Sequence, residues 1–188
     1  FGNPLDHILI STFSRCIAFV VLLVVTGKVG LAMGAEELGK YSASPYKIVS
    51  FELAKTEKTA GDIIKEWGGV GKYLAKKEII IDFGFILCYV ALLGFVCFWL
   101  ADSQKGMWTS PAWLALGWSM PIAGLLDVIE NIALLRMLDM DKGASSNLAG
   151  IAFWTALPKS IITTYFAVIP IAMVTFIMLV GFLLKVIR

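Results

Sequence analysis

Four long apolar runs, separated by polar segments, dominate the chain. They cover residues of about 8–34, 79–101, 112–138 and 160–186. Each run is at least as long as the roughly 20 apolar residues that cross a bilayer as an α-helix. The pattern therefore predicts an all-α, polytopic membrane protein with four transmembrane helices in one domain over residues 1–188.

The last apolar stretch, residues 148–184, is too long for a single span, since a helix of that length would reach about 55 Å against a hydrocarbon core of about 30 Å. Its only charged residue is Lys159, and Pro158 precedes it. Because proline interrupts the helical hydrogen-bond ladder, Pro158 is expected to separate an interfacial piece from the fourth span.

A polar loop, residues 35–78, separates the first two spans and holds eight lysines and seven acids. The sequence from Thr59 to Asp62 resembles a capping box, which predicts the start of a helix. An apolar stripe follows it, and three glycines are expected to divide it into two short helices. We expect this amphipathic helical loop to lie on the membrane surface. The stripe residues are Ile63, Ile64, Trp67, Val70 and Leu74, and the glycines are Gly68, Gly69 and Gly71.

The third span carries polar residues well inside it. Asp127, Glu130 and Asn131 have the spacing i, i+3 and i+4, which places them on one helix face. Gly117, Met120 and Gly124 continue this face as a mostly small-residue stripe that permits close approach of another helix. Ionisable groups at membrane depth are costly and usually face a bundle interior or a cavity.

Further polar residues are expected at a similar depth in the other spans. Together they form a candidate polar cluster: Asp82, Asp127, Glu130, Asn131, Lys159 and Thr163. In one interpretation the acids pair with Lys159 or Arg136 and hold helices together, which membrane bundles commonly do. In the other, the cluster binds or moves a ligand, because intramembrane charge is often functional. Glu52 is expected to be a solvated loop acid, with folding back onto the cluster as the alternative.

Composition excludes several classes of function. Hydrophobic residues make up 59% of the 188, mean hydropathy is +0.82, and a net charge of +2 does not favour nucleic-acid binding. The three cysteines form no C-x-x-C spacing, and His7 is the only histidine. We therefore expect no catalytic, cofactor-binding or metal-ligating residues, and an enzyme is the least favoured class.

Four segments resemble a family of small, uncharacterised bacterial membrane proteins. They are residues 50–54, 63–67, 82–85 and 124–131. The resemblance covers the polar loop and the second and third spans. It implies no activity, but it is in keeping with four spans and with a bacterial inner membrane.

Charge asymmetry gives an orientation. The lysines of the polar loop place it in the cytoplasm and both termini outside, while Trp99, Trp108 and Trp113 cluster at one interface. The leading hypothesis is a non-enzymatic accessory or structural subunit of a larger membrane complex. The alternative is a small proton-, ion- or lipid-binding or transport protein that uses the polar cluster. Expected partners are membrane lipids and other membrane subunits or further copies of the chain, with no cofactor and no nucleic acid.

Overall fold

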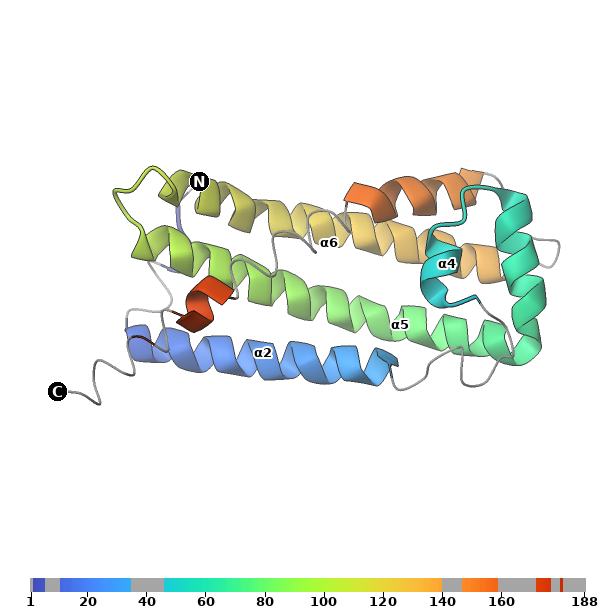
Figure 1. Cartoon of the computed structure of the whole chain (residues 1–188), viewed down its shortest axis with the longest axis horizontal. Coiled ribbons are helices and arrows are strands. Elements are labelled where there is room, and N and C mark those ends of the chain that lie inside the picture. The colour runs from blue at the N-terminus through green and yellow to red at the C-terminus, as the bar shows by residue number, and fades with distance from the viewer. Residues whose placement is uncertain are drawn as a thin grey trace. The chain divides into compact units, whose positions relative to one another are not determined.

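The computed structural model describes residues 2–5, 11–34, 46–139, 147–158, 172–176 and 180. Within these ranges every regular element is a helix, which confirms the predicted all-α class (Figure 1). The main helices are α2 (Thr12–Gly34), α4 (Ile48–Glu52), α5 (Glu57–Ser103) and α6 (Ser110–Asp139). Residues 147–158 and 172–176 are also helical.

Three of these helices are long and apolar enough to cross a membrane. They are α2, over Thr12–Met33, together with α5 and α6. Helices α2 and α6 correspond to the first and third predicted spans, and the predicted second span, residues 79–101, lies within the longer α5. Most of the predicted fourth span lies outside the described residues, as do Lys159 and Thr163.

Side-chain hydroxyls cap the first turns of α2 and α5. Ser11 Oγ accepts a hydrogen bond of 3.1 Å from the amide of Ser14, and Thr56 Oγ1 accepts one of 3.2 Å from the amide of Thr59. These bonds satisfy amide groups that have no partner within the helix. The predicted start at Thr59 is therefore one turn too late, because Thr56 already caps the amide of Thr59.

Helix α5 changes direction at Gly68 (Figure 1). Gly68 has φ 60° and ψ −166°, a conformation essentially restricted to glycine. The predicted break at this residue is confirmed, but the two short helices are not: α5 continues without a further break to Ser103. The stretch after Gly68 has a packed side, since Ala75 and Ile79 are buried. Val70 is 62% exposed, because the turn at Gly68 removes it from the stripe of Ile63 and Trp67.

The chain divides into two compact units. The first comprises Phe1–Thr26, Cys88–Ala123 and Ile161–Arg188, and the second comprises Gly27–Leu87 and Gly124–Ser160. The core of the first unit is Leu5, Phe19, Leu92, Phe95, Val96, Trp99, Leu100 and Val174. Trp99 packs edge-on against Phe19 and Phe95. Trp99 is therefore a core residue of this unit and not an exposed interface residue.

Small residues bring α5 and α6 close together in the first unit. A Cβ atom on Gly117 would lie 2.6 Å from the ring of Phe98, and one on Gly94 would lie 3.8 Å from the carbonyl oxygen of Gly117. Pro121 lies four residues after Gly117 in α6 and has no amide hydrogen, so it cannot form the usual helical hydrogen bond to the carbonyl oxygen of Gly117. Met120 is buried. The predicted close helix approach along this stripe is confirmed at Gly117.

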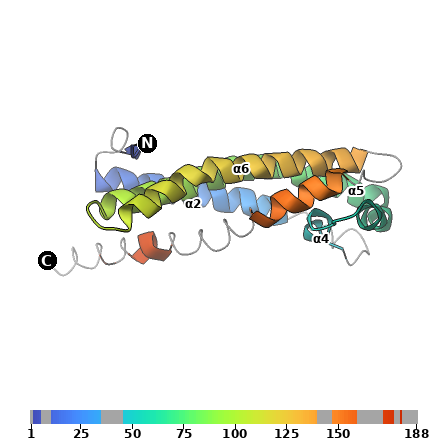
Figure 2. The same cartoon turned by 90° about the horizontal axis from the view of Figure 1, so that it is seen from above.

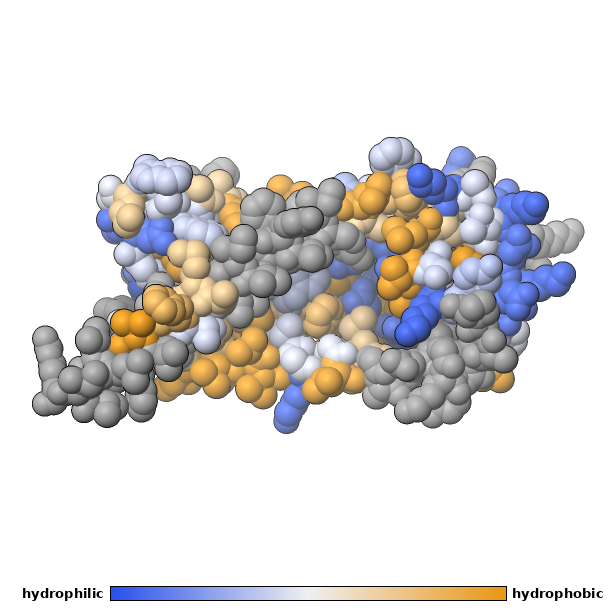
Figure 3. Space-filling model, viewed as in Figure 1, coloured by the Kyte–Doolittle hydropathy of each residue, from blue (hydrophilic) through white to orange (hydrophobic). Residues whose placement is uncertain are grey.

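The core of the second unit is formed by the first part of α5 together with α4, α6 and the helix over residues 147–158. That core is Phe51, Ala54, Ala60, Ile63, Trp67, Ala75, Ile79, Ala133, Leu134, Met137, Leu138, Ala149 and Ala152. The helix over residues 147–158 lies beside α6 (Figures 1 and 2). Hydrophilic side chains gather over the first part of α5 (Figure 3). The apolar side of residues 57–67 thus packs on protein, which corrects the expectation that it faces the membrane surface.

Candidate functional site

Three polar residues of the candidate cluster are enclosed on one side of α6. Asp127, Glu130 and Asn131 are 4%, 0% and 3% exposed. Their spacing places them on the face that also buries Leu134 and Met137 in the core of the second unit. The prediction that the three share a buried helix face is confirmed. Burying two carboxyl groups costs free energy unless polar partners compensate for the lost water. Asp127 and Glu130 therefore require a helix packing that is ordered well enough to keep such partners in place.

A hydrogen bond connects α6 to α5 at this level. Asn131 Nδ2 donates to Asp82 Oδ2 over 2.7 Å, and Asp82 is half-buried. The two residues are far apart in sequence, so the contact joins the predicted second and third spans. The predicted juxtaposition of Asp82 with the third-span cluster is thereby observed for Asn131.

A small pocket adjoins this hydrogen bond. Its volume is about 70 Å³, and its lining residues are Met33, Ile48, Glu52, Glu78, Ile79, Asp82 and Asn131. This space is enough for a few water molecules, each of which needs at least about 10–15 Å³ and several polar neighbours. Glu52 therefore lies at the same pocket as Asp82 and Asn131, in agreement with the alternative in which it folds back toward the cluster.

Aromatic packing holds α4 against this part of α5. Trp67 Nε1 donates a hydrogen bond of 2.8 Å to the carbonyl oxygen of Tyr46, just before α4. The rings of Phe51 and Trp67 pack edge-on with centroids 5.2 Å apart, and Phe51 is fully buried. Lys55 Nζ lies 4.4 Å from the ring centroid of Phe153. These contacts fix the wall of the pocket that carries Ile48 and Glu52.

The pocket lining offers carboxylate oxygens and one carboxamide. Within the described ranges, no three histidine, cysteine, aspartate or glutamate side chains are grouped so as to hold a metal ion. Asp82 accepts the carboxamide hydrogen bond, and Glu52 and Glu78 add acidic groups to the lining. Chemically, such a lining can hold water or bind cationic groups, and its hydrogen bonds can join helices.

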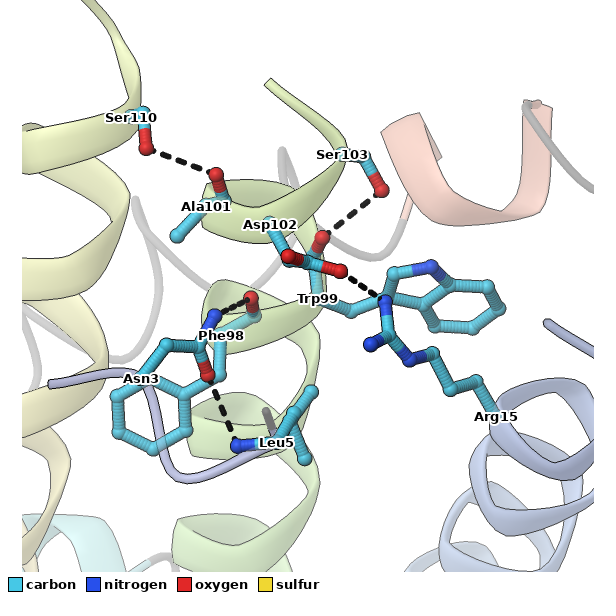
Figure 4. A network of polar contacts seen from close by, with 9 residues as sticks. All are labelled: Asn3, Leu5, Arg15, Phe98, Trp99, Ala101, Asp102, Ser103 and Ser110. Carbon is cyan, nitrogen blue, oxygen red and sulfur yellow. Dashed lines mark hydrogen bonds and ion pairs between the residues drawn. The ribbon is translucent and has the colours of Figure 1, made fainter. Parts of the chain in front are cut away.

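A second polar network lies in the first unit, at the end of α5 (Figure 4). Arg15 on α2 forms an ion pair with Asp102, and Asn3 Nδ2 donates a hydrogen bond of 2.8 Å to the carbonyl oxygen of Phe98. The apolar pattern did not predict this ion pair. The signal for this pairing was an arginine and an aspartate at the ends of neighbouring apolar runs.

Comparisons with known proteins found no match for this chain. No family model matches the sequence, no curated protein matches it, and no solved structure matches the chain.

Proposed function

We propose that the chain is an integral protein of a bacterial inner membrane with four spans. The three candidate membrane helices support the first three spans, and the apolar run over residues 160–186 supports the fourth. On α5, residues 83–101 carry no charge and would cover about 29 Å as a helix, close to the thickness of a hydrocarbon core. The polar loop lies in the cytoplasm and both termini lie outside.

Within that membrane the protein acts as a non-enzymatic structural or accessory subunit of a larger complex. The observation that carries this proposal is the hydrogen bond from Asn131 on α6 to Asp82 on α5. Interhelical hydrogen bonds of this kind hold membrane helices together without requiring a ligand. The polar cluster then serves helix assembly.

Exposed apolar surface supports the need for partners. Helix α2 is the least enclosed of the three candidate spans. Its exposed side chains include Phe13, Ile17, Val20, Val21, Leu23, Val24, Val25 and Leu31. Lipid tails or helices of other subunits can cover such a face, since neither requires polar groups from it.

Gentle detergent extraction followed by native mass measurement tests the subunit proposal. Co-purification of other membrane polypeptides in fixed stoichiometry is the expected result. A chain recovered alone after crosslinking in the native membrane would contradict it.

Orientation is tested separately by cysteine labelling. In a chain whose Cys16, Cys88 and Cys97 are replaced by serine, Lys58→Cys should resist an impermeant thiol reagent in intact cells, and Arg188→Cys should react. The reverse pattern would overturn the orientation without affecting the proposed spans.

The acid-lined pocket favours one alternative, a small proton-, ion- or lipid-binding protein. Glu52, Glu78 and Asp82 line the same space of about 70 Å³. In that case a monovalent or divalent cation should raise the thermal unfolding temperature of the purified chain, and Asp82→Asn should abolish the effect. If the cluster is structural, Asp82→Asn, Asp127→Asn and Glu130→Gln change stability but no cation dependence exists to be lost.

A further inference from the structure

Several polar side chains of the turn between α5 and α6 form hydrogen bonds within the protein. Gln104 Oε1 accepts a hydrogen bond of 3.1 Å from Trp113 Nε1 and a second from the hydroxyl of Thr109. Ser110 Oγ donates to the carbonyl oxygen of Ala101 over 2.8 Å (Figure 4). Backbone bonds from Met107 to Gln104 and from Ser110 to Met107 close the turn. These polar side chains, which water would solvate in an ordinary loop, therefore form their hydrogen bonds with other groups of the protein.

The same turn presents two large apolar side chains outward. Met107 is 56% exposed and Trp108 is 87% exposed, the highest value among the exposed large hydrophobic residues of the described chain. Gly106, with φ 89°, allows the backbone to reverse just before them. Two adjacent large apolar side chains at such exposed positions are not the arrangement expected for a loop in water.

We propose that Met107 and Trp108 insert into one leaflet at the boundary between lipid headgroups and acyl chains. This inference rests on the proposed membrane location. Indole prefers that boundary because its ring is apolar and its N–H group can reach water or headgroups. Lys105, exposed on the same turn, is suited to contact lipid phosphate. The occupant of this surface is phospholipid.

The size of the surface argues against a protein partner. A specific protein interface buries about 800 Å² on each side and contains some 20–30 residues. Among the described residues, this turn presents two neighbouring large apolar side chains, beside an exposed lysine and glycine. Two residues suffice for an interfacial anchor, since each contributes through partitioning alone.

Depth-dependent fluorescence quenching tests the inference on the full chain. Wild type and Trp108→Phe are reconstituted into vesicles of phosphatidylcholine and phosphatidylglycerol whose acyl chains are brominated near the ester or near the methyl end. The Trp108 contribution is the difference between the two spectra. We expect that contribution to be blue-shifted, quenched more strongly by the shallow bromines, and poorly quenched by aqueous acrylamide. Trp154→Phe is the control for the subtraction of spectra, because it removes another strongly exposed tryptophan.

Two outcomes would overturn the inference. A Trp108 contribution quenched by acrylamide and not by brominated lipid places the turn in water, and one quenched by neither places it against protein. Flotation of the same vesicles after an alkaline carbonate wash separates these failures from that of the proposed function. Wild type that floats while Trp108 escapes bromine contradicts the anchor alone, whereas wild type that does not float contradicts the membrane location itself.

Discussion

The indole nitrogen of Trp67 donates a hydrogen bond of 2.8 Å to the carbonyl oxygen of Tyr46. This bond ties the segment that enters α4 to the first part of α5, and the ring of Trp67 also packs against Phe51. Segment 46–54 supplies Ile48 and Glu52 to the pocket. The geometry of the pocket therefore depends on a contact formed outside it.

Replacing Trp67 should separate the two parts of this contact. Trp67→Phe keeps an aromatic ring but removes the donor, so we expect a loss of about 1 kcal/mol in the free energy of unfolding. Trp67→Ala also leaves a cavity in the core and should cost about 3–5 kcal/mol. Chemical unfolding in detergent, followed by circular dichroism, measures both. Trp154→Phe, at a 71% exposed position, is the control, and equal effects of Trp67→Phe and Trp154→Phe would contradict the role of the hydrogen bond.

The direction change in α5 depends on the backbone of Gly68. Its φ of 60° and ψ of −166° are strained for any residue with a Cβ atom. We expect Gly68→Ala to lower the free energy of unfolding by about 1–3 kcal/mol, in the range of costs for such conformations. Gly69→Ala is the matched control: a Cβ atom there meets nothing within 4 Å, and alanine favours the helix by up to about 1 kcal/mol. A Gly68→Ala protein as stable as wild type would show that the turn does not need glycine.

The apolar pattern alone predicted where the main helices lie. The first and third runs correspond to α2 and α6, because these helices combine length with nearly continuous apolar character. The length of α5 was not predicted, because the glycines at positions 68, 69 and 71 favoured two short helices separate from the second span. Ala75 and Ile79 give the stretch after Gly68 a buried side, and such tertiary packing is not visible in a hydropathy pattern.

The candidate site was predictable in its components but not in its connections. The spacing of Asp127, Glu130 and Asn131 indicated one buried face, and burial agrees. Which residue of the cluster would meet Asp82 depends on the rotation of α5 against α6, which the sequence does not specify. The contribution of Glu52 depends on the Trp67 contacts that hold α4 in place.

Two ion pairs of different exposure should differ in their contribution to stability. The side chains of Arg15 and Asp102 are 13% and 22% exposed, whereas those of Lys76 and Asp139 are 44% and 59% exposed. We expect Arg15→Met to cost about 1.5–3 kcal/mol, because it leaves Asp102 partly enclosed without this cation. Lys76→Met should cost at most about 1 kcal/mol and lose its effect in high salt. Thermal unfolding of both variants at low and high salt checks this, and equal costs would contradict it.

The hydrogen bond from Asn131 to Asp82 is the contact on which the structural interpretation depends. A double-mutant cycle with Asp82→Ala, Asn131→Ala and the double variant, measured by unfolding in bicelles, tests it most directly. Hydrogen bonds between membrane helices show coupling energies of about 0.6 kcal/mol on average and up to about 1.7 kcal/mol. We predict a favourable coupling free energy in that range, with all three variants still membrane-inserted. Single-variant effects that add to the double-variant effect within about 0.3 kcal/mol would contradict the claim that this pair joins α5 to α6.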